Sequence, residues 1–438
     1  RWFVVCCFEL MSLKTFCILL IMLLVVSFSN ATISDSAEVT SLNSLYDQLG
    51  GPDWNNSGSW GEGDPCDNEW YGVTCLEDTT VNRIFLPNNN LVGVIPETLY
   101  FPNLYSLYLA ENDLEGAVPS FNLPELQYLY LHQNRLTGEL PDWNLPKLDT
   151  INVSDNEFTG PIPNWNMPEL REIHAHSNEL SGPLPLLESC QKLEYLSIKV
   201  NSFQSPLPDW NFPELRILLA TDAGLIGPLP QLISLPSVSD VWLDDNQITG
   251  PLPDWSFPTI NTLKLSYNQL SGSIPNYSMP TLTTLYLDSN MLSGALPSFD
   301  NLENLKTLQL RFNNLCGPLP NDPPATLGND LSGNVFQCPL PDWCASAKCG
   351  TCDDVQGVCK CPDGTLGDGD NCQPCDSSCA TCVNEANSCT SCANGLVLHM
   401  NQCLDECPEL MIEENGVCVC RDGTFDVGVL DCQPCDSS

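Results

Sequence analysis

Histidine is the residue type with which this chain could bind a metal or move a proton, and the chain has four histidines. Two of them, His174 and His176, flank Ala175, and Glu172 lies two residues before His174. In an extended strand, side chains two positions apart point to the same face, so these three are expected to share a face. Two imidazoles and a carboxylate are ligands that Zn²⁺ accepts. The competing interpretation is that Glu172, His174 and His176 are solvated residues of a recognition surface.

Motifs for covalent or phosphate chemistry do not accompany these histidines. The sequence contains no G-x-S-x-G, no H-E-x-x-H and no phosphate-binding loop. A catalytic nucleophile or base also needs an orienting partner, and His132 would lie two strands from His174, roughly 10 Å away. We therefore expect a protein that is not an enzyme, that needs no cofactor, and in which Glu172, His174 and His176 are at most a weak metal site.

The elements that position these residues belong to a repeated sequence motif. Residues 126–141 read L-x-x-L-x-L-x-x-N-x-L-x-G-x-L-P, and this leucine-rich-repeat pattern recurs every 22 or 23 residues over residues 81–322. Each L-x-x-L-x-L segment alternates apolar and variable residues, which predicts a strand with one buried face. Eleven stacked strands predict a repeat solenoid with a concave parallel β-sheet. The repeats begin at Val81, Leu104, Leu126, Leu148, Leu170, Leu193, Leu215, Val238, Ile260, Leu282 and Leu305.

Each repeat also carries an asparagine where the chain leaves the strand. A buried amide there can bond backbone groups of neighbouring turns. The seventh repeat has Ala223 instead, so we expect a local defect filled by Asp222 or by water. The ladder consists of Asn89, Asn112, Asn134, Asn156, Asn178, Asn201, Asn246, Asn268, Asn290 and Asn313.

The opposite side of each repeat carries an aromatic residue followed by a proline. One ring per repeat in constant register favours core packing over sugar or proline-motif binding. Proline excludes a helix there, which predicts an extended back. Cys190 falls in this segment and is expected to be a buried free thiol. The rings are Phe121, Trp143, Trp165, Trp210, Trp255, Tyr277 and Phe299.

Residues 32–80 are expected to cap the first repeat. A short helix with Leu42 and Leu45 on one face ends at Gly50, and a D-P-C…W-x-G-V-T-C segment follows, in which Cys66 and Cys75 would close a loop. In this order the elements resemble the N-terminal cap of plant-type leucine-rich-repeat proteins, and the resemblance covers about residues 34–320. It implies a curved solenoid that binds ligands on its concave sheet or flank. That class includes receptor-kinase ectodomains and inhibitors of polygalacturonases.

The two ends of the chain carry different signals. Residues 11–31 combine one basic residue, an apolar run and small residues before Thr32, which predicts a secretory signal peptide, with a retained signal anchor as the alternative. Residues 1–10 read as translated upstream sequence. The chain has 25 cysteines, and sixteen of them lie between Cys349 and Cys435. Such density predicts disulfides, which form outside the cell, and this agrees with export to a secreted or cell-surface location.

The cysteine-rich end begins after an expected C-terminal cap at residues 323–346, where Cys316, Cys338 and Cys344 form an odd trio. From residue 347 to 438 the cysteine spacing resembles furin-like repeats, which implies small disulfide-rich modules. The phrase around Cys420 and Cys435 repeats that around Cys361 and Cys375 and stops one residue early. We therefore expect a truncated fragment, with a membrane anchor only in a missing C-terminal part.

The charge of the chain restricts its partners. Lys and Arg number 15 against 55 Asp and Glu, a formal net charge of -40, which disfavours nucleic acid. Aromatic residues near carboxylates at exposed strand positions favour a protein or peptide ligand, with a basic ligand included, or a glycan. The expected ligand-binding residues are Phe85, Tyr108, Tyr130, His174, Asp240, Trp242, Asp244, Asp245, Tyr286 and Asp288.

Three N-glycosylation triplets begin at Asn55, Asn152 and Asn276. A glycan on Asn152 would lie in the middle of a strand and compete with the metal hypothesis. The sequence as a whole favours a non-enzymatic extracellular recognition protein, as part of a receptor or adhesion protein. A secreted inhibitor of a polysaccharide-degrading enzyme and a structural wall or matrix component remain alternatives.

Overall fold

The computed structural model describes residues 36–231, 234–319 and 331–338, residue 340, and short stretches between residues 365 and 434. The expected signal peptide, the upstream residues and most of the C-terminal cap lie outside these described residues. Two units are distinguished: residues 1–203 with 211–215, and residues 204–210 with 216–438. They are called unit 1 and unit 2 below, and each is described by itself.

The N-terminal part of unit 1 is one helix followed by an aromatic cluster. Helix α2 (Ser36–Gln48) buries Leu42 and Leu45 completely, and the left-handed Gly50 (φ 73°) separates it from the 3₁₀ turn η1 (Gly51–Asp53). The helix is fixed to the first repeat by Glu38, a fully buried carboxylate that accepts hydrogen bonds from Thr80 Oγ1 at 2.7 Å and the Val81 amide at 3.1 Å.

The cluster beyond the helix covers the apolar end of the array. The Trp54 and Trp60 rings meet edge to face at 4.9 Å, and Trp60 packs on the buried Trp70 at 5.2 Å. A disulfide joins Cys66 to Cys75, as expected. Each indole donates its N–H to a backbone carbonyl, so these large rings are buried without losing their hydrogen bonds.

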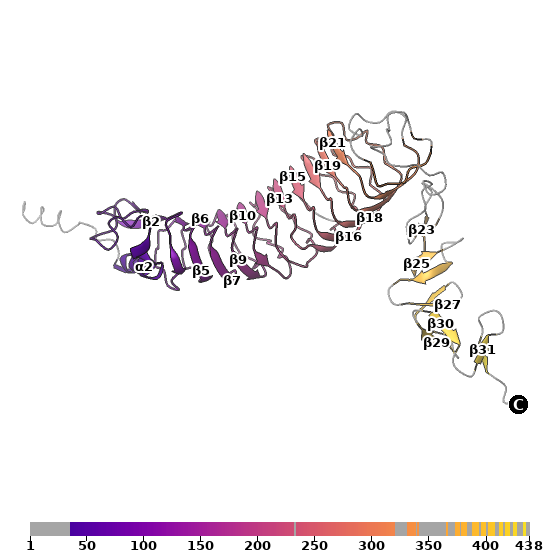
Figure 1. Ribbon diagram of the computed structural model, residues 1–438, viewed down its shortest axis with the longest axis horizontal. Helices are drawn as coiled ribbons and strands as arrows, with labels where there is room; N and C mark the ends of the chain where they lie inside the picture. Colours follow the sequence, from indigo (N-terminus) through magenta and orange to yellow (C-terminus); the bar gives the residue numbers. More distant parts are fainter. Residues whose placement is uncertain are drawn as a thin grey trace, which may run out of the picture. The chain divides into compact units, whose positions relative to one another are not determined.

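The main sheet of unit 1 stacks one strand per turn (Figure 1). β1 pairs antiparallel with β2, and the strands that follow pair in parallel and in constant register. The middle residue of each strand, such as Leu129, points into the core and its neighbours point outward. The strands are β1 (Val73–Leu76), β2 (Thr80–Phe85), β4 (Ser106–Tyr108), β6 (Tyr128–Tyr130), β8 (Thr150–Asn152), β10 (Glu172–His174) and β12 (Tyr195–Ser197).

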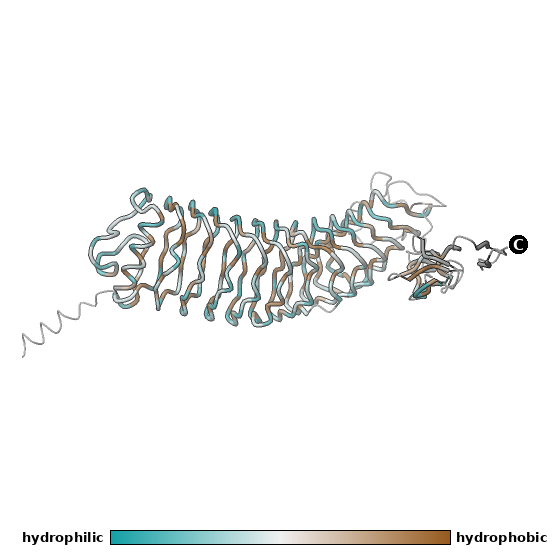
Figure 2. Tube along the Cα trace, turned by 90° about the horizontal axis from the view of Figure 1, so that it is seen from below, coloured by the Kyte–Doolittle hydropathy of each residue, from teal (hydrophilic) through white to brown (hydrophobic). Residues whose placement is uncertain are grey.

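Unit 2 continues the same pattern. Its strands are also parallel and in register, with a buried leucine or valine at the centre of each. Figure 2 shows hydrophobic residues returning at the same place on successive turns. The strands are β13 (Ile217–Leu219), β15 (Asp240–Trp242), β17 (Thr262–Lys264), β19 (Thr284–Tyr286) and β21 (Thr307–Gln309).

A second parallel sheet in each unit was not foreseen in the sequence. It forms from the L-x-G segment that follows most ladder positions, where the glycine has a positive φ. At Gly93 (φ 127°) a Cβ would lie 2.2 Å from the Gln48 carbonyl oxygen, so only glycine allows helix α2 to approach. The strands are β3 (Val92–Val94), β5 (Asp113–Ala117), β7 (Arg135–Glu139), β9 (Glu157–Gly160), β11 (Glu179–Leu180), β14 (Ile226–Pro228), β16 (Gln247–Pro251), β18 (Gln269–Gly272), β20 (Met291–Gly294) and β22 (Asn314–Leu315).

The asparagine ladder has the expected structural role. Asn156 is typical: its amide nitrogen donates to the carbonyls of Leu131, Val153 and Ser154, and its oxygen accepts the Leu136 amide at 3.0 Å. At the alanine position the expectation for Asp222 was wrong, because that side chain is exposed while the Ala223 methyl is fully buried. The Ala223 amide instead donates to Asn246 Oδ1 at 3.1 Å.

The aromatic residues of the back are core, as predicted. Trp143 stacks between Phe121 and Trp165, with ring centroids 6.1 Å and 5.9 Å away. Its indole donates to the Pro119 carbonyl of the preceding turn at 3.0 Å. Cys190 is a buried free thiol, and burial raises its pKa.

The cysteine-rich segment is built of short strands joined by disulfides. Cys379 pairs with Cys389, Cys392 with Cys403, and Cys407 with Cys418. Cys316 and Cys338 each take part in a disulfide, whereas Cys344 lies outside the described residues. No helix in the described part of the chain is long and apolar enough to cross a membrane. The strands are β23 (Thr365–Leu366), β24 (Gln373–Pro374), β25 (Cys379–Cys382), β26 (Cys389–Cys392), β27 (Val397–His399), β28 (Gln402–Leu404), β29 (Met411–Glu414), β30 (Val417–Cys420), β31 (Thr424–Asp426) and β32 (Cys432–Pro434).

Candidate functional site

A row of three aromatic side chains, called the ring row below, crosses the first three parallel strands of unit 1. Phe85, Tyr108 and Tyr130 are register partners, and successive ring centroids are 4.9 Å and 4.8 Å apart. The Arg83 guanidinium lies 4.5 Å from the centroid of the Phe85 ring. Burial is the main cause that raises the pKa of Tyr108 and of Tyr130, so both hydroxyls keep their protons. The row offers ring faces and neutral hydroxyls on the outward side of the sheet.

His132 closes one side of this aromatic row. Its ring meets Tyr108 and Tyr130 edge to face, at 5.8 Å and 6.1 Å between centroids. Burial lowers its pKa, so the imidazole is neutral at neutral pH. Its Nδ1 is buried and makes no hydrogen bond within the described residues.

The expected metal ligands are brought only partly together. His174 Nε2 lies 2.9 Å from Glu172 Oε2, and the His174 ring stacks on Tyr195 with centroids 4.5 Å apart. His176 is directed elsewhere, since its Nδ1 lies 3.2 Å from Ser177 Oγ. Within the described chain, Glu172, His174 and His176 do not bring three ligand atoms within 4.8 Å of one another. Glu172 and His174 therefore form a hydrogen-bonded pair on the outward face of the sheet.

The aromatic residues of unit 2 surround a lysine. The Lys264 ammonium lies 3.4 Å from the centroid of the Trp242 ring and 5.7 Å from that of Tyr286. These residues share one register position on β15, β17 and β19. The Trp242 indole N–H is buried and has no hydrogen-bond acceptor among the described residues. The Lys264 ammonium group therefore already occupies a face of the Trp242 indole ring.

Three of the four expected aspartates lie at the surface. Asp240 accepts a hydrogen bond from Ser239 Oγ at 2.7 Å, and Asp244 accepts one from Thr221 Oγ1 at 3.0 Å. Burial, and then the neighbouring carboxylates with Asp244 first, raise the pKa of Asp245. Carboxylates are therefore crowded where β15 ends.

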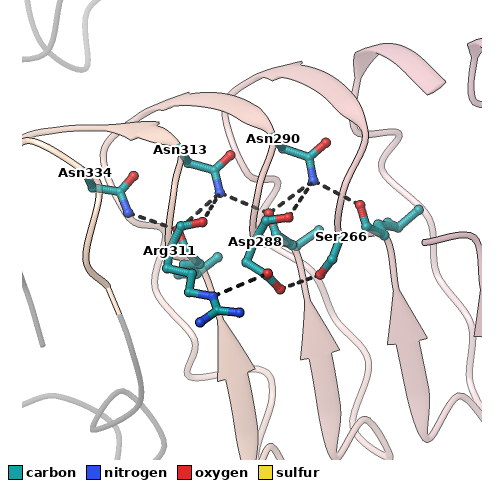
Figure 3. A network of polar contacts seen from close by, with 9 residues as sticks. Ser266, Asp288, Asn290, Arg311, Asn313 and Asn334 are labelled. Carbon is teal, nitrogen blue, oxygen red and sulfur yellow. Dashed lines mark hydrogen bonds and ion pairs between the residues drawn. The ribbon is translucent and has the colours of Figure 1, made fainter. Parts of the chain in front are cut away.

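Asp288 departs from the expectation that it faces a ligand. It is 1% exposed. Its carboxylate accepts a hydrogen bond from Ser266 Oγ at 2.5 Å and lies 3.6 Å from Arg311 Nε (Figure 3). Asp288 is also the main cause that raises the pKa of Arg311. The buried carboxylate is neutralised by the protein itself, so Asp288 positions Arg311 and does not contact a ligand directly.

Sequence reasoning missed the cations of this surface. Arg83 and Lys264 lie on the outward face next to aromatic residues, and each covers a ring of the chain itself. Lys264 and Trp242 occupy equivalent positions in consecutive repeats, so a column-by-column comparison for cation–π pairs could have found the contact. Tyr195, which stacks on His174, could have been found in the same way.

The glycosylation triplets have different surroundings. Asn55 and Asn276 are exposed. Asn152 is half-buried, and its Oδ1 accepts hydrogen bonds from the amide and the hydroxyl of Ser154 at 3.1 Å and 2.8 Å. Tyr130 and His174 are its register partners on either side.

Comparison with known protein families gives a match to the Leucine Rich Repeat model at residues 125–145. The match coincides with the phrase that supplies β6, a ladder asparagine and the following glycine turn. The solenoid is a leucine-rich-repeat array. A disulfide-rich segment follows it in the chain.

Curated relatives match parts of the chain. A probable leucine-rich repeat receptor-like protein kinase of Arabidopsis thaliana is 38% identical over 79 residues, 18% of this chain and 8% of the relative. R-spondin-3 of Homo sapiens is 41% identical over 70 residues, 15% of this chain and 25% of the relative. Major surface-labeled trophozoite antigen 417 of Giardia intestinalis is 42% identical over 76 residues, 17% of this chain and 10% of the relative. The chain thus spans a quarter or less of each.

Two solved structures share the fold of the leucine-rich-repeat array. The PEPR1–AtPEP1 structure has a TM-score of 0.51 at 24% identity and covers 70% of this chain and 49% of its own. A plant ice-binding protein has a TM-score of 0.50 at 24% identity and covers 72% of this chain and all of its own. At this identity the likeness concerns the fold.

Proposed function

We propose that the protein recognises a protein or peptide ligand outside the cell on the outward face of its main sheet. The observation that carries this proposal is the row of Phe85, Tyr108 and Tyr130. The opposite face of the same strands is filled by Ile84, Leu107 and Leu129, all fully buried. The core therefore does not require rings on the outward face, and such rings are typical anchors of binding surfaces.

An extracellular location is supported by the disulfides. Cys66–Cys75 and the three bridges after residue 379 would persist in an oxidising compartment. The names of two relatives describe a receptor-like kinase and a surface antigen. A role as part of a cell-surface receptor or adhesion protein follows if this likeness extends beyond the matched segments.

The chemistry of the face favours a ligand with basic side chains. A net charge of -40 attracts cations over a distance, and neutral tyrosine rings can take a cation on their faces. A basic ligand would therefore be steered to the array and held by the ring row.

The test is selection of peptides on the intact chain. A random peptide library displayed on phage is panned against the secreted protein, and selected peptides are measured against a Tyr108→Ala, Tyr130→Ala double variant. We expect basic peptides to be enriched and their affinity to fall about tenfold or more in the double variant.

The matched control is Tyr100→Ala. Tyr100 is 50% exposed but lies outside the row, so its replacement should leave the affinity unchanged. The proposal is wrong if no peptide is enriched, or if the selected peptides bind the double variant as well as they bind the original chain.

A further inference from the structure

The residue before each ladder position has an unusual backbone conformation. In all eleven repeats its φ lies between 47° and 58°, in the left-handed region. Asparagine, aspartate and other polar residues accept this conformation more easily than bulky apolar residues do. We call the series of these positions the rim. It consists of Asn88, Glu111, Gln133, Asp155, Ser177, Val200, Asp222, Asp245, Tyr267, Ser289 and Phe312.

Two rim residues of unit 2 are large aromatics. Tyr267 is 51% exposed and Phe312 is 57% exposed, the two highest values among the exposed large hydrophobic side chains of the described chain. Each therefore combines backbone strain with an exposed apolar ring. Neither local conformational preference nor burial in the core explains these two residues, whereas contact with a partner would.

The rings are held in place by the polar network described above. The Arg311 guanidinium lies 5.8 Å from the centroid of the Phe312 ring, and a hydrogen bond with Tyr267 contributes to its raised pKa after Asp288, the main cause. Arg311 is held by the buried carboxylate of Asp288 (Figure 3). This anchoring keeps the two rings presented in a defined arrangement.

A small residue stands between the two aromatic positions on the rim. Ser289 separates Tyr267 from Phe312 on the rim, and its side chain is small. Because successive strands are about 4.8 Å apart, the two aromatic positions are roughly 10 Å apart. An apolar side chain of a partner can lie over Ser289, next to the Arg311 side chain that contacts both rings.

Carboxylates lie next to the rings, and they indicate which charge a partner should carry. Asp222 and Asp245 precede Tyr267 on the rim, and Asp244 lies beside them. The raised pKa of Asp245, due to burial and then to Asp244, Asp222 and Asp288, indicates that these carboxylates repel one another. A cationic side chain supplied by the partner would relieve this repulsion.

We propose that Asp245, Tyr267 and Phe312 form a docking surface for a protein segment that carries a lysine or arginine next to an apolar side chain. The basic group binds at Asp245, and the apolar group lies between the two rings. This surface is separate from the ring row of unit 1, so it adds a second partner to the proposed recognition function.

The test uses three synthetic peptides of equal length in a serine–glycine background. One carries interspersed lysine and leucine, one lysine alone, and one glutamate and leucine. Binding to the full chain is measured by isothermal titration calorimetry. We expect the lysine–leucine peptide to bind most tightly, and its affinity to fall about tenfold in a Tyr267→Asn, Phe312→Asn double variant.

Asparagine is chosen because it accepts the left-handed conformation. Relief of the backbone strain at the two positions should offset the loss of the contacts with Arg311, so the melting temperature of the double variant should equal or exceed that of the original chain. Ser289→Asn is the matched control, on the same rim, and should keep the affinity. Asp245→Asn should weaken binding of the lysine–leucine peptide and reduce its dependence on salt.

Three outcomes would overturn the proposal. The original chain could bind the three peptides equally or not at all. The double variant could bind the lysine–leucine peptide unchanged. A lower melting temperature in the double variant would mean that the rings stabilise the fold, and docking would then not be needed to explain them.

Discussion

The ammonium group of Lys264 lies 3.4 Å from the centroid of the Trp242 ring. The protein thus places its own cation on the face of the aromatic residue that its sequence marks as a binding anchor. A ligand cation can occupy that face only if the lysine side chain moves away. The half-buried Tyr108 and Tyr130 of unit 1 need no such displacement, which is why the ring row carries the proposed function.

The Lys264 contact should contribute measurably to stability. Lys264→Gln removes the charge while keeping a polar side chain, and we expect the free energy of unfolding to fall by about 1 kcal/mol. Urea denaturation measures the change. Lys306→Gln, at an exposed lysine of the same unit, is the control and should change little. Equal effects of the two substitutions would show that the ring contact contributes nothing.

Stability should depend on pH through two half-buried imidazoles. Burial lowers the pKa of His132 and of His176 in the folded chain. Below the ordinary histidine pKa of about 6.5, the unfolded chain therefore binds more protons than the folded chain. The free energy of unfolding then decreases as the pH falls, until the folded-state pKa values are reached.

Urea denaturation at about pH 7.5 and about pH 5.5 checks this expectation. A His132→Phe, His176→Gln double variant should lose less stability between the two conditions than the original chain does. The explanation fails if both proteins lose the same amount, since carboxylates would then account for the whole dependence.

Loss of one ladder asparagine should be costly. Asn156→Ala would leave the Leu136 amide and the carbonyls of Leu131, Val153 and Ser154 without the partner they now have. We expect a loss of about 3 kcal/mol in the free energy of unfolding, measured with urea. Asn144→Ala, at an exposed asparagine of the same unit, should cost less than about 0.5 kcal/mol. Similar losses at the two sites would contradict the structural role of the ladder.

A glycan on Asn152 would decide how much of the unit 1 face is accessible. Its register partners are Tyr130 and His174, so an attached sugar would cover both. We expect mass spectrometry of the secreted chain to find glycans at the exposed Asn55 and Asn276 as well as at Asn152. Asn152→Gln should then increase peptide affinity at the ring row. An unmodified Asn152 would mean that the row is accessible without any such change.

Much of the scaffold could be predicted because burial repeats with the sequence. Leu107, Leu129 and Ile151 each occupy the centre of a strand, and a period of 22 or 23 residues reveals them without any structure. The asparagine ladder and the buried rings of the back follow the same period. Each of these features can be recognised from the sequence of a single repeat.

The binding surface was harder to predict because it depends on neighbouring repeats. Asp288 is buried only because Ser266 and Arg311, one repeat away on either side, provide a hydrogen bond and a charge. Lys264 reaches Trp242 from the next strand in the same manner. The second sheet was missed for a different reason. Its strands are two to five residues long, and most contain a glycine with a positive φ, so they lack the alternation that indicates a strand.

The asparagine ladder gives the array a direction. Each amide oxygen accepts an N–H from the turn before it, so every turn except the one before Ala223 is completed by the asparagine of its successor. For the last repeat that successor is Asn334, which accepts the Leu315 amide at 3.0 Å and donates to the Leu310 carbonyl at 2.9 Å. A shortened protein that ends with a whole repeat would therefore begin to unravel from its C-terminal end. Any fragment meant to fold alone should extend past Asn334.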